Sequence, residues 1–242
     1  MKYVLSWEDN FDHDGAPNPE KWRFETGGHG FGNGEEQYYT DKLENAFIEQ
    51  GILNIVARKE DFENRHYTSA KLTTKGIRTM CHGKIEVTAK LPKGGGTWPA
   101  IWILGENIRE VGWPECGEVD IMEHVGNNPG SIHFSLHSKN RNFRIGNQQT
   151  FFFTQEDVCD TFHEYGMDWD KDSISFIFDK KTMATFRRKE NDGVEEWPFN
   201  HGYYLIMNLA LGGCWGGNID DSIFPATMQI KSVKVWERRD VD

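Results

Sequence analysis

Residues 84–90 read Lys84-Ile85-Glu86-Val87-Thr88-Ala89-Lys90, with polar and apolar residues alternating at every position. Side chains of a β-strand point alternately to the two faces of its sheet, so this pattern predicts a strand with one buried and one solvated face. The same alternation recurs in residues 173–179, 203–209 and 228–236. Helical periodicity is scarce, and residues 155–160 are the best candidate for a short helical turn.

Further short apolar segments are separated by turn signals about every 8–12 residues, which is typical of an all-β sandwich or barrel. They are residues 46–48, 52–58, 70–74, 83–90 and 98–104. No linker, repeat or low-complexity tract divides the chain. We therefore expect one all-β domain over residues 1–242.

Composition excludes several classes of protein. The net charge of −11 argues against a nucleic-acid surface, which needs clustered Lys and Arg. No run of about 18 apolar residues exists, so no membrane span is predicted. The chain starts without the long apolar core of a signal peptide. Nine Trp in 242 residues favour a surface for flat ligands such as sugar rings, although any one of them can equally fill a core.

The four cysteines are scattered, without CxxC spacing, and predict neither a metal cage nor a disulfide framework. We interpret them as buried or incidental thiols. They are Cys81, Cys116, Cys159 and Cys214.

The chemistry is concentrated in one stretch, Glu118-Val119-Asp120-Ile121-Met122-Glu123. A regular strand would point Glu118 and Asp120 to one face and Glu123 to the other. A one-residue bulge after Asp120 returns Glu123 to the first face and turns Met122 away, and bulges are common beside active sites. Buried acids are costly unless they are paired, protonated or acting on a substrate. A merely solvated acidic strand conflicts with the apolar residues between the acids.

Two carboxylates on one face fit glycoside hydrolysis. Retention of anomeric configuration needs carboxyl groups about 5–5.5 Å apart, and inversion needs about 6.5–9.5 Å. The sequence permits retention without proving it. Asp120 lies between Glu118 and Glu123, where a shared proton or a like charge raises the pKa of a neighbour. That arrangement suits one Glu as nucleophile and the other as a protonated acid.

Aromatic and imidazole side chains flank the acids. Trp98 and Trp102 share a strand face, Trp113 directly precedes the acids, and His133 shares a face with His137. Such rings suit a pyranose-binding groove, in which apolar sugar faces stack and hydroxyls form hydrogen bonds. A zinc site is the competing interpretation, but two His four residues apart on a strand are separated by about 13 Å. For His137 we keep a hydrogen-bonded core or cleft role.

Residues 27–34 contain five Gly, and no helix pattern or Lys-Ser/Thr follows that would make them a phosphate loop. We expect this segment to form a flexible wall of the cleft.

The segment Trp113-Pro114-Glu115-Cys116-Gly117-Glu118-Val119-Asp120-Ile121-Met122-Glu123-His124-Val125-Gly126 resembles the active-site signature of glycoside hydrolase family 16. Its Glu-x-Asp-x-x-Glu spacing is similar to the laminarinase branch, which cleaves β-1,3-glucans; the lichenase branch has Glu-x-Asp-x-Glu. Other family-like segments follow in order along nearly the whole chain. They are residues 30–33, 36–39, 67–70, 90–94, 98–102, 208–213, Trp215 and 220–225.

The resemblance implies a β-jelly-roll sandwich of two antiparallel sheets with an open concave cleft, and a retaining endo-hydrolase that needs no cofactor. It implies that Glu118 is the nucleophile, Asp120 the assisting acid and Glu123 the acid/base. Glucan-binding positions are implied for Asn33, Trp98, Trp102, Trp113 and His133. It also implies a monomer and an extracellular or periplasmic location.

Three departures from the family pattern are expected to matter, one of which is the start without a signal peptide, which leaves secretion resting on the resemblance. Met80, Cys81 and His82 replace an aromatic segment and would alter one sugar subsite. Relatives often bind a structural Ca²⁺ between the termini; here those positions read Asp9-Asn10-Phe11 and Lys231. A Lys ammonium cannot ligate Ca²⁺ but can occupy the place of the ion, so we expect no metal beside Gly51.

Two other functions stay open. One is hydrolysis of another polysaccharide such as agar, porphyran or carrageenan, with Arg78, Arg141 and Arg144 as candidate contacts for sulfate. The other is β-glucan recognition without catalysis, which the presence of all three acids opposes.

Overall fold

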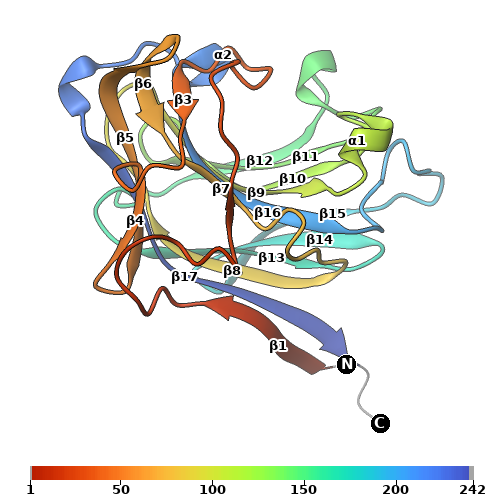
Figure 1. Cartoon of the computed structure of the whole chain (residues 1–242). Helices are drawn as coiled ribbons and strands as arrows, with labels where there is room; N and C mark the ends of the chain where they lie inside the picture. Colours follow the sequence, from red (N-terminus) through yellow and green to blue (C-terminus); the bar gives the residue numbers. More distant parts are fainter. Residues whose placement is uncertain (1, 240–242) are drawn as a thin grey trace.

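The structure is a computed structural model that describes residues 2–239. Two β-sheets pack face to face (Figure 1). The smaller sheet runs in spatial order β12 (Gln149–Thr154), β11 (Ser131–His137), β10 (Glu118–Glu123), β9 (Thr97–Gly105), β16 (Tyr203–Leu211), β7 (Lys71–Thr73) and β2 (Arg23–Phe24).

The larger sheet has ten strands among the described residues. Its order is β15 (Lys181–Arg187), β14 (Ser173–Phe178), β13 (His163–Trp169), β8 (Gly83–Lys90), β17 (Ala226–Arg239), β5 (Ile52–Phe62), β6 (Arg65–Ser69) and β3 (Gln37–Tyr39), with β1 (Lys2–Asp9) on β17 and β4 (Ala46–Glu49) on β5. The pairings are antiparallel except for β3 with β6, which is parallel. The expected all-β sandwich of two largely antiparallel sheets is confirmed.

The core lies between the sheets, and the alternation in β8 explains how each strand contributes to it. Ile85, Val87 and Ala89 are buried, whereas the polar residues between them are partly exposed. Across the sandwich, the rings of Phe134 on β11 and Phe176 on β14 stack with centroids 4.9 Å apart. Side chains from both inner faces therefore interdigitate, as in other sheet-on-sheet packings.

β16 is buried along its whole length, which a strand with one solvated face would not be. Its inner face contributes Leu205, Met207 and Leu209 to the core. Its outer face carries Asn208, which lines a cavity. The expected one-sided strand over 203–209 is therefore covered on both faces, because loops rise over the outer face of the smaller sheet.

Helices are short. They are α1 (Ile108–Val111), α2 (Gly213–Gly216), and the 3-10 turns η1 (Phe143–Ile145) and η2 (Asp221–Ile223). The expected turn at residues 155–160 is a single turn in which Asp157 O accepts from Thr161 N at 3.0 Å, and it does not extend into a helix. No described helix is long and apolar enough to cross a membrane. Figure 1 shows α1 and α2 above the same face of the smaller sheet. Ile108 of α1 and Trp215 of α2 line the cavity on that face.

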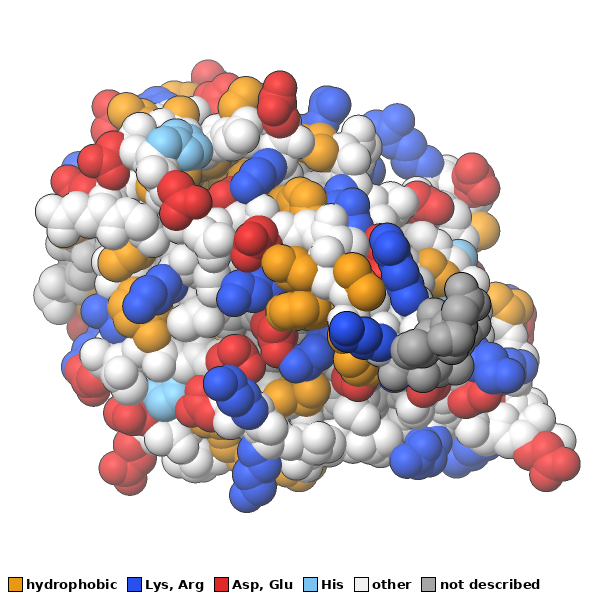
Figure 2. Space-filling view, turned by 90° about the horizontal axis from the view of Figure 1, so that it is seen from below, with side chains coloured by type: hydrophobic (Ala, Val, Ile, Leu, Met, Phe, Trp, Pro, Cys, Tyr) orange, Lys and Arg blue, Asp and Glu red, His pale blue; other side chains and the backbone are white. Residues whose placement is uncertain are grey.

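The two ends of the described chain meet at the larger sheet, where β1 pairs with β17 from Lys2↔Arg239 to Asp9↔Val233 (Figure 1). The buried Asp9 accepts from Trp22 Nε1 at 2.7 Å and from Lys21 Nζ at 3.2 Å. The cation that contacts Asp9 is thus Lys21. Lys231 is exposed on β17, directly after Ile230, which pairs with Leu53 of β5. That Lys231 occupies the place of the ion stays a prediction. The absence of Ca²⁺ stays a prediction. Seen from below, this side of the molecule has acidic and basic side chains interspersed (Figure 2).

Candidate active site

The acidic strand β10 contains the expected bulge. Its register with β11 shifts between Asp120, opposite Ser135, and Glu123, opposite His133. Met122 is fully buried in the core between the sheets, whereas Glu123 lines the cavity together with Glu118 and Asp120. The extra residue brings the three carboxylates to one face, as the sequence predicts.

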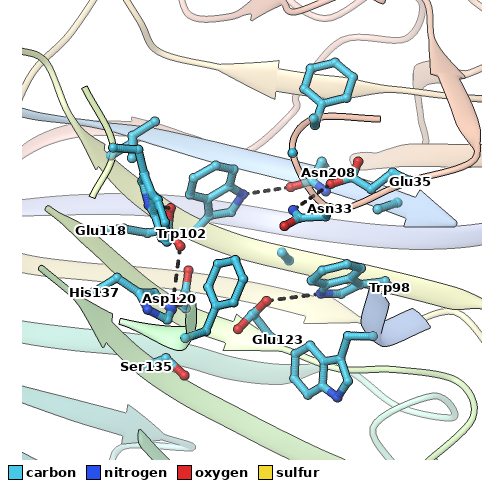
Figure 3. Close-up of a pocket in the computed structure, with 18 of the residues that line it drawn as sticks. Asn33, Glu35, Trp98, Trp102, Glu118, Asp120, Glu123, Ser135, His137 and Asn208 are labelled. Carbon is cyan, nitrogen blue, oxygen red and sulfur yellow. Dashed lines mark hydrogen bonds and ion pairs between the residues drawn. The ribbon is translucent and has the colours of Figure 1, made fainter. Parts of the chain in front are cut away.

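Each glutamate is held by a tryptophan from a neighbouring segment, and Figure 3 shows one of the two pairs, Trp98 with Glu123. Trp113 Nε1 donates to Glu118 Oε2 at 3.0 Å. Trp98 Nε1, on β9, donates to Glu123 Oε1 at 3.1 Å. An indole N–H only donates, so it fixes one carboxylate oxygen and leaves the other available for chemistry. The Trp residues therefore position the acids as well as line the groove.

His137 lies opposite Glu118 on β11 and faces two of the acids. Its Nε2 atom is 3.1 Å from Asp120 Oδ2 and 3.8 Å from Glu118 Oε1. The side chain is 7% exposed, so water screens these contacts weakly. Sequence analysis gave His137 only a core or cleft role, and the structure brings it into contact with the acids.

Burial raises the pKa of all three acids. The pKa of Glu118 rises to about 8, first because of burial and then because of the nearby charge of Asp120; His137 and Trp113 oppose the rise. The pKa of Glu123 lies well above its usual range, again through burial and then the charge of Asp120. Burial also raises the pKa of Asp120. The cluster therefore retains protons at neutral pH.

The acids lie in a cavity of about 710 Å³ on the outer face of the smaller sheet. All five residues expected to bind substrate line it, namely Asn33, Trp98, Trp102, Trp113 and His133. Residues of the glycine-rich segment line it as well, including Phe31 and Gly32, which confirms that this segment forms a wall. That these residues bind sugar stays a prediction.

One end of the cavity is an aromatic surface that sequence analysis did not assemble. Trp215 contacts Trp98 edge-on with ring centroids 5.6 Å apart, and His133 at 4.8 Å. His133 in turn stacks on Phe152 of β12, at 5.3 Å and 22° between the planes. Phe152 is 63% exposed. We call these four rings the aromatic platform; it extends from Glu123 to the edge strand of the sheet.

Glu35 and Asn208 are two polar residues of the cavity that sequence analysis also missed. Both are 6% exposed. A signal for Asn208 was present, since it is the only polar side chain in the stretch Ile206-Met207-Asn208-Leu209-Ala210, and a lone buried amide needs partners. Glu35 had no such signal, because it lies among turn residues and reads as a solvated acid.

Several expectations about the cleft are wrong. Met80, Cys81 and His82 do not line the cavity; Met80 belongs to the core, and the other two line a separate depression. Of the three arginines, only Arg144 lines the cavity, where its guanidinium lies 4.4 Å from the centre of the Trp113 ring. Arg141 is paired with Asp192, and Arg78 with Glu237.

The cysteines and possible metal ligands add no second centre. The four thiols are free, and burial raises the pKa of Cys116 to about 12, as for an inert buried thiol. Within residues 2–239, the group with ligand atoms close enough for one ion is Glu118, Asp120 and His137. His133 is not part of it, which removes the paired-histidine arrangement of the zinc interpretation.

A β-sandwich with buried carboxylates and indole rings in an open cleft defines a carbohydrate-cleaving class of enzyme. Residues 33–232 match the description "Glycosyl hydrolases family 16". The chain belongs to this family and is a glycoside hydrolase of the laminarinase-like type.

Relatives cover nearly the whole chain. A "Beta-glucanase" of Rhodothermus marinus is 42% identical over 97% of this chain and 85% of its own length. A "Glucan endo-1,3-beta-glucosidase" of Cryptopygus antarcticus is 36% identical over 97% and 92%. The solved laminarinase from Rhodothermus marinus superimposes with a TM-score of 0.96 at 39% identity, covering 99% of both chains. The fold and the family thus agree.

Proposed function

We propose that this enzyme cleaves internal linkages of β-1,3-glucan of the laminarin type, or of mixed β-1,3-1,4-glucan, with retention of configuration. Support comes from the similarity to the laminarinase of Rhodothermus marinus over the full chain. An open cavity of about 710 Å³ suits an internal segment of a polymer. The observation that carries the proposal is the bulge that brings Glu118, Asp120 and Glu123 to one face.

In this mechanism Glu118 attacks the anomeric carbon while Glu123 donates its proton to the glycosidic oxygen. The glycosidic bond breaks, a glycosyl–Glu118 ester forms, and the leaving sugar departs with the proton. Glu123, now a carboxylate, takes a proton from water, which attacks the ester and releases Glu118.

The electrostatics support this division of roles. The nucleophile must ionise before the acid does. Trp113 and His137 stabilise the charge on Glu118, which has the pKa of about 8, and the pKa of Glu123 is raised well above its usual range. Asp120 lies between the two and would hold a proton close to Glu118 in its neutral form. His137 orients Asp120.

Substrate contacts follow from the lining of the cavity. We assign sugar stacking to Trp98, Trp102 and Trp113, and hydrogen bonds to Asn33 and His133. A glucan polymer does not cross membranes, so we also propose an extracellular or periplasmic location. A monomer of one domain would suffice, since each catalytic residue comes from the same chain.

The direct test is release of reducing ends from laminarin, lichenan, agarose and carrageenan by the purified protein. Release from laminarin, with or without lichenan, is the expected result. Release from agarose or carrageenan alone would replace the proposed substrate, and binding of laminarin without release from any polymer would replace the enzyme by a binding protein.

A further inference from the structure

Glu35 is a buried carboxylate that the reaction above does not use. It lies at the end of the glycine-rich segment, is 6% exposed and lines the cavity. Three side chains converge on it: Asn33 Nδ2 at 3.1 Å from Oε1, and Gln37 Nε2 at 2.7 Å and Tyr39 OH at 3.2 Å from Oε2. All three approach with donor groups, so Glu35 acts only as an acceptor.

From Tyr39 the hydrogen bonds continue to the floor of the cleft. Asn208 Nδ2 donates to Tyr39 OH at 3.0 Å. Trp102 Nε1 donates to Asn208 Oδ1 at 2.7 Å (Figure 3). An indole nitrogen can only donate, so Asn208 must turn its carbonyl to Trp102 and its amino group to Tyr39. The hydroxyl of Tyr39 then has its proton directed at Glu35. The donor at one end, Trp102, and the acceptor at the other, Glu35, therefore require the same direction for every hydrogen bond between them.

The carboxylate of Glu35 also fixes the orientation of two further side-chain amides, those of Gln37 and Asn33. Gln37 donates to Glu35 and accepts from the backbone N–H of Leu211 at 2.8 Å, at the end of β16. Asn33 turns its amino group to Glu35, which leaves its Oδ1 atom as the polar atom available to the cavity. One buried charge therefore determines the orientation of three amide side chains.

We propose that Glu35 is a positioning residue for substrate: it makes Asn33 present a carbonyl oxygen, an acceptor for a sugar hydroxyl, and it holds the ring of Trp102 through Tyr39 and Asn208. The proposal rests on the proposed function, because it assumes a glucan in the cavity. Glu35 itself does not touch the reacting atoms.

The loop around Glu35 is packed closely enough to transmit this role. Cys214 N donates to Asn33 O at 2.8 Å, and a Cβ atom on Gly213 would lie 2.8 Å from the same oxygen. Gly213 has a φ of +72°, so both its conformation and this contact require glycine. The backbone of Asn33 is thereby fixed, and only its side-chain amide is left to be oriented.

The test is Glu35→Gln, which has nearly the same size but brings one donor group to a site surrounded by donors. One side-chain amide must then flip. Either Asn33 turns its amino group to the cavity, or the hydrogen bonds from Tyr39 to Asn208 reverse direction, which would leave the amino group of Asn208 facing the indole N–H of Trp102. We expect KM for laminarihexaose to rise roughly tenfold, kcat to stay within about twofold, and the pH profile of kcat to be unchanged. The matched control is Glu36→Gln, because Glu36 is the exposed neighbour outside the cavity, and it should match the wild type.

A double-mutant cycle with Asn33→Ala separates positioning from a general structural effect. If Glu35 acts through Asn33, the two changes are non-additive by about 1 kcal/mol, a factor of five or so in KM. Additive effects, a KM equal to that of the Glu36→Gln control, or a loss confined to kcat would each overturn the proposal.

Tyr39→Phe keeps the test open if Glu35→Gln does not fold, because it interrupts only the branch to Asn208 and Trp102. A raised KM supports the proposal, and a wild-type KM contradicts it. Failure of the proposed function is a separate outcome: wild-type protein that releases no reducing ends from laminarin would refute that function. Binding of laminarihexaose by calorimetry would then compare the same variants.

Discussion

Trp98 and Glu123 are joined by a 3.1 Å hydrogen bond, so one side chain both lines the cleft and fixes the proposed proton donor. The relation between Trp113 and Glu118 is equivalent, at 3.0 Å. The rings that form the groove are therefore also the groups that orient the acids. Substitutions of these Trp residues would combine loss of stacking with loss of orientation, so sharper tests come from the acids themselves.

The first prediction concerns the nucleophile. Glu118→Gln keeps the hydrogen bond from Trp113 but cannot form the glycosyl ester, so kcat on laminarin should fall by about 10³-fold or more. Reducing-end assays measure the loss, and circular dichroism checks the fold. Residual activity above a few per cent of wild type would contradict the role of Glu118. For the wild type, proton NMR of the first product should show the β-anomer, and the α-anomer would refute retention.

The second prediction concerns Asp120. Its negative charge raises the pKa of Glu123, so a neutral Asn at this position lowers that pKa. Glu123 then loses its proton at lower pH, and the alkaline limb of the kcat–pH profile should move to lower pH, on the order of one unit. The measurement is kcat for laminarin between pH 5 and about 10 for Asp120→Asn and wild type. A limb that stays in place or moves upward would show that Asp120 does not act on Glu123 by charge.

The third prediction links the same burial to stability. The native Glu118 holds its proton up to about pH 8, whereas a carboxyl in the unfolded chain releases it near its ordinary value of 4.5. Between these values the native state binds more protons than the unfolded state, so stability falls as pH rises through this window.

Glu118→Gln is neutral throughout and removes this contribution. Its Tm relative to wild type should therefore be larger at pH 8 than at pH 5, because only the wild type must ionise or retain the proton of Glu118. Differential scanning calorimetry at pH 5 and pH 8 makes the comparison. A Tm difference that is independent of pH would mean that burial does not raise the pKa of Glu118 in the folded protein.

The fourth prediction concerns the aromatic platform. Phe152 is 63% exposed yet stacks on His133, an arrangement that suits a sugar ring beyond the central subsites. Phe152→Ala should raise KM for long laminarin chains by about three- to tenfold and leave laminaritriose nearly unchanged. Val194→Ala is the control, since Val194 is 71% exposed and lies outside the cavity. An equal effect on long and short substrates would contradict an outer subsite.

Much of this site could be predicted because strand parity is a strict rule. In β8 the alternation of polar and apolar residues shows which side chains face the core. In β10 the apolar residues between Glu118, Asp120 and Glu123 show the same for the acids. The bulge followed from the same parity, since three acids on one face require an extra residue.

What could not be predicted was which distant segments meet. Glu35 and Asn208 are 173 positions apart and communicate through Tyr39, and nothing local marks that encounter. The contact of Lys21 with Asp9 is a similar case, because it depends on how the loop after β1 folds back. Phe152 reads as one more apolar residue of an apolar strand, and only the pairing with β11 shows that it faces outward.

The bulge in β10 has a consequence for insertions and deletions. Removing Ile121 would leave Glu-Val-Asp-Met-Glu, in which simple alternation already points all three acids to one face. The longer and the shorter strand thus present the same acids, and a change of one residue in length at this point preserves their common orientation. During evolution, β10 can therefore gain or lose one residue between Asp120 and Glu123 while all three acids stay on the same face of the sheet.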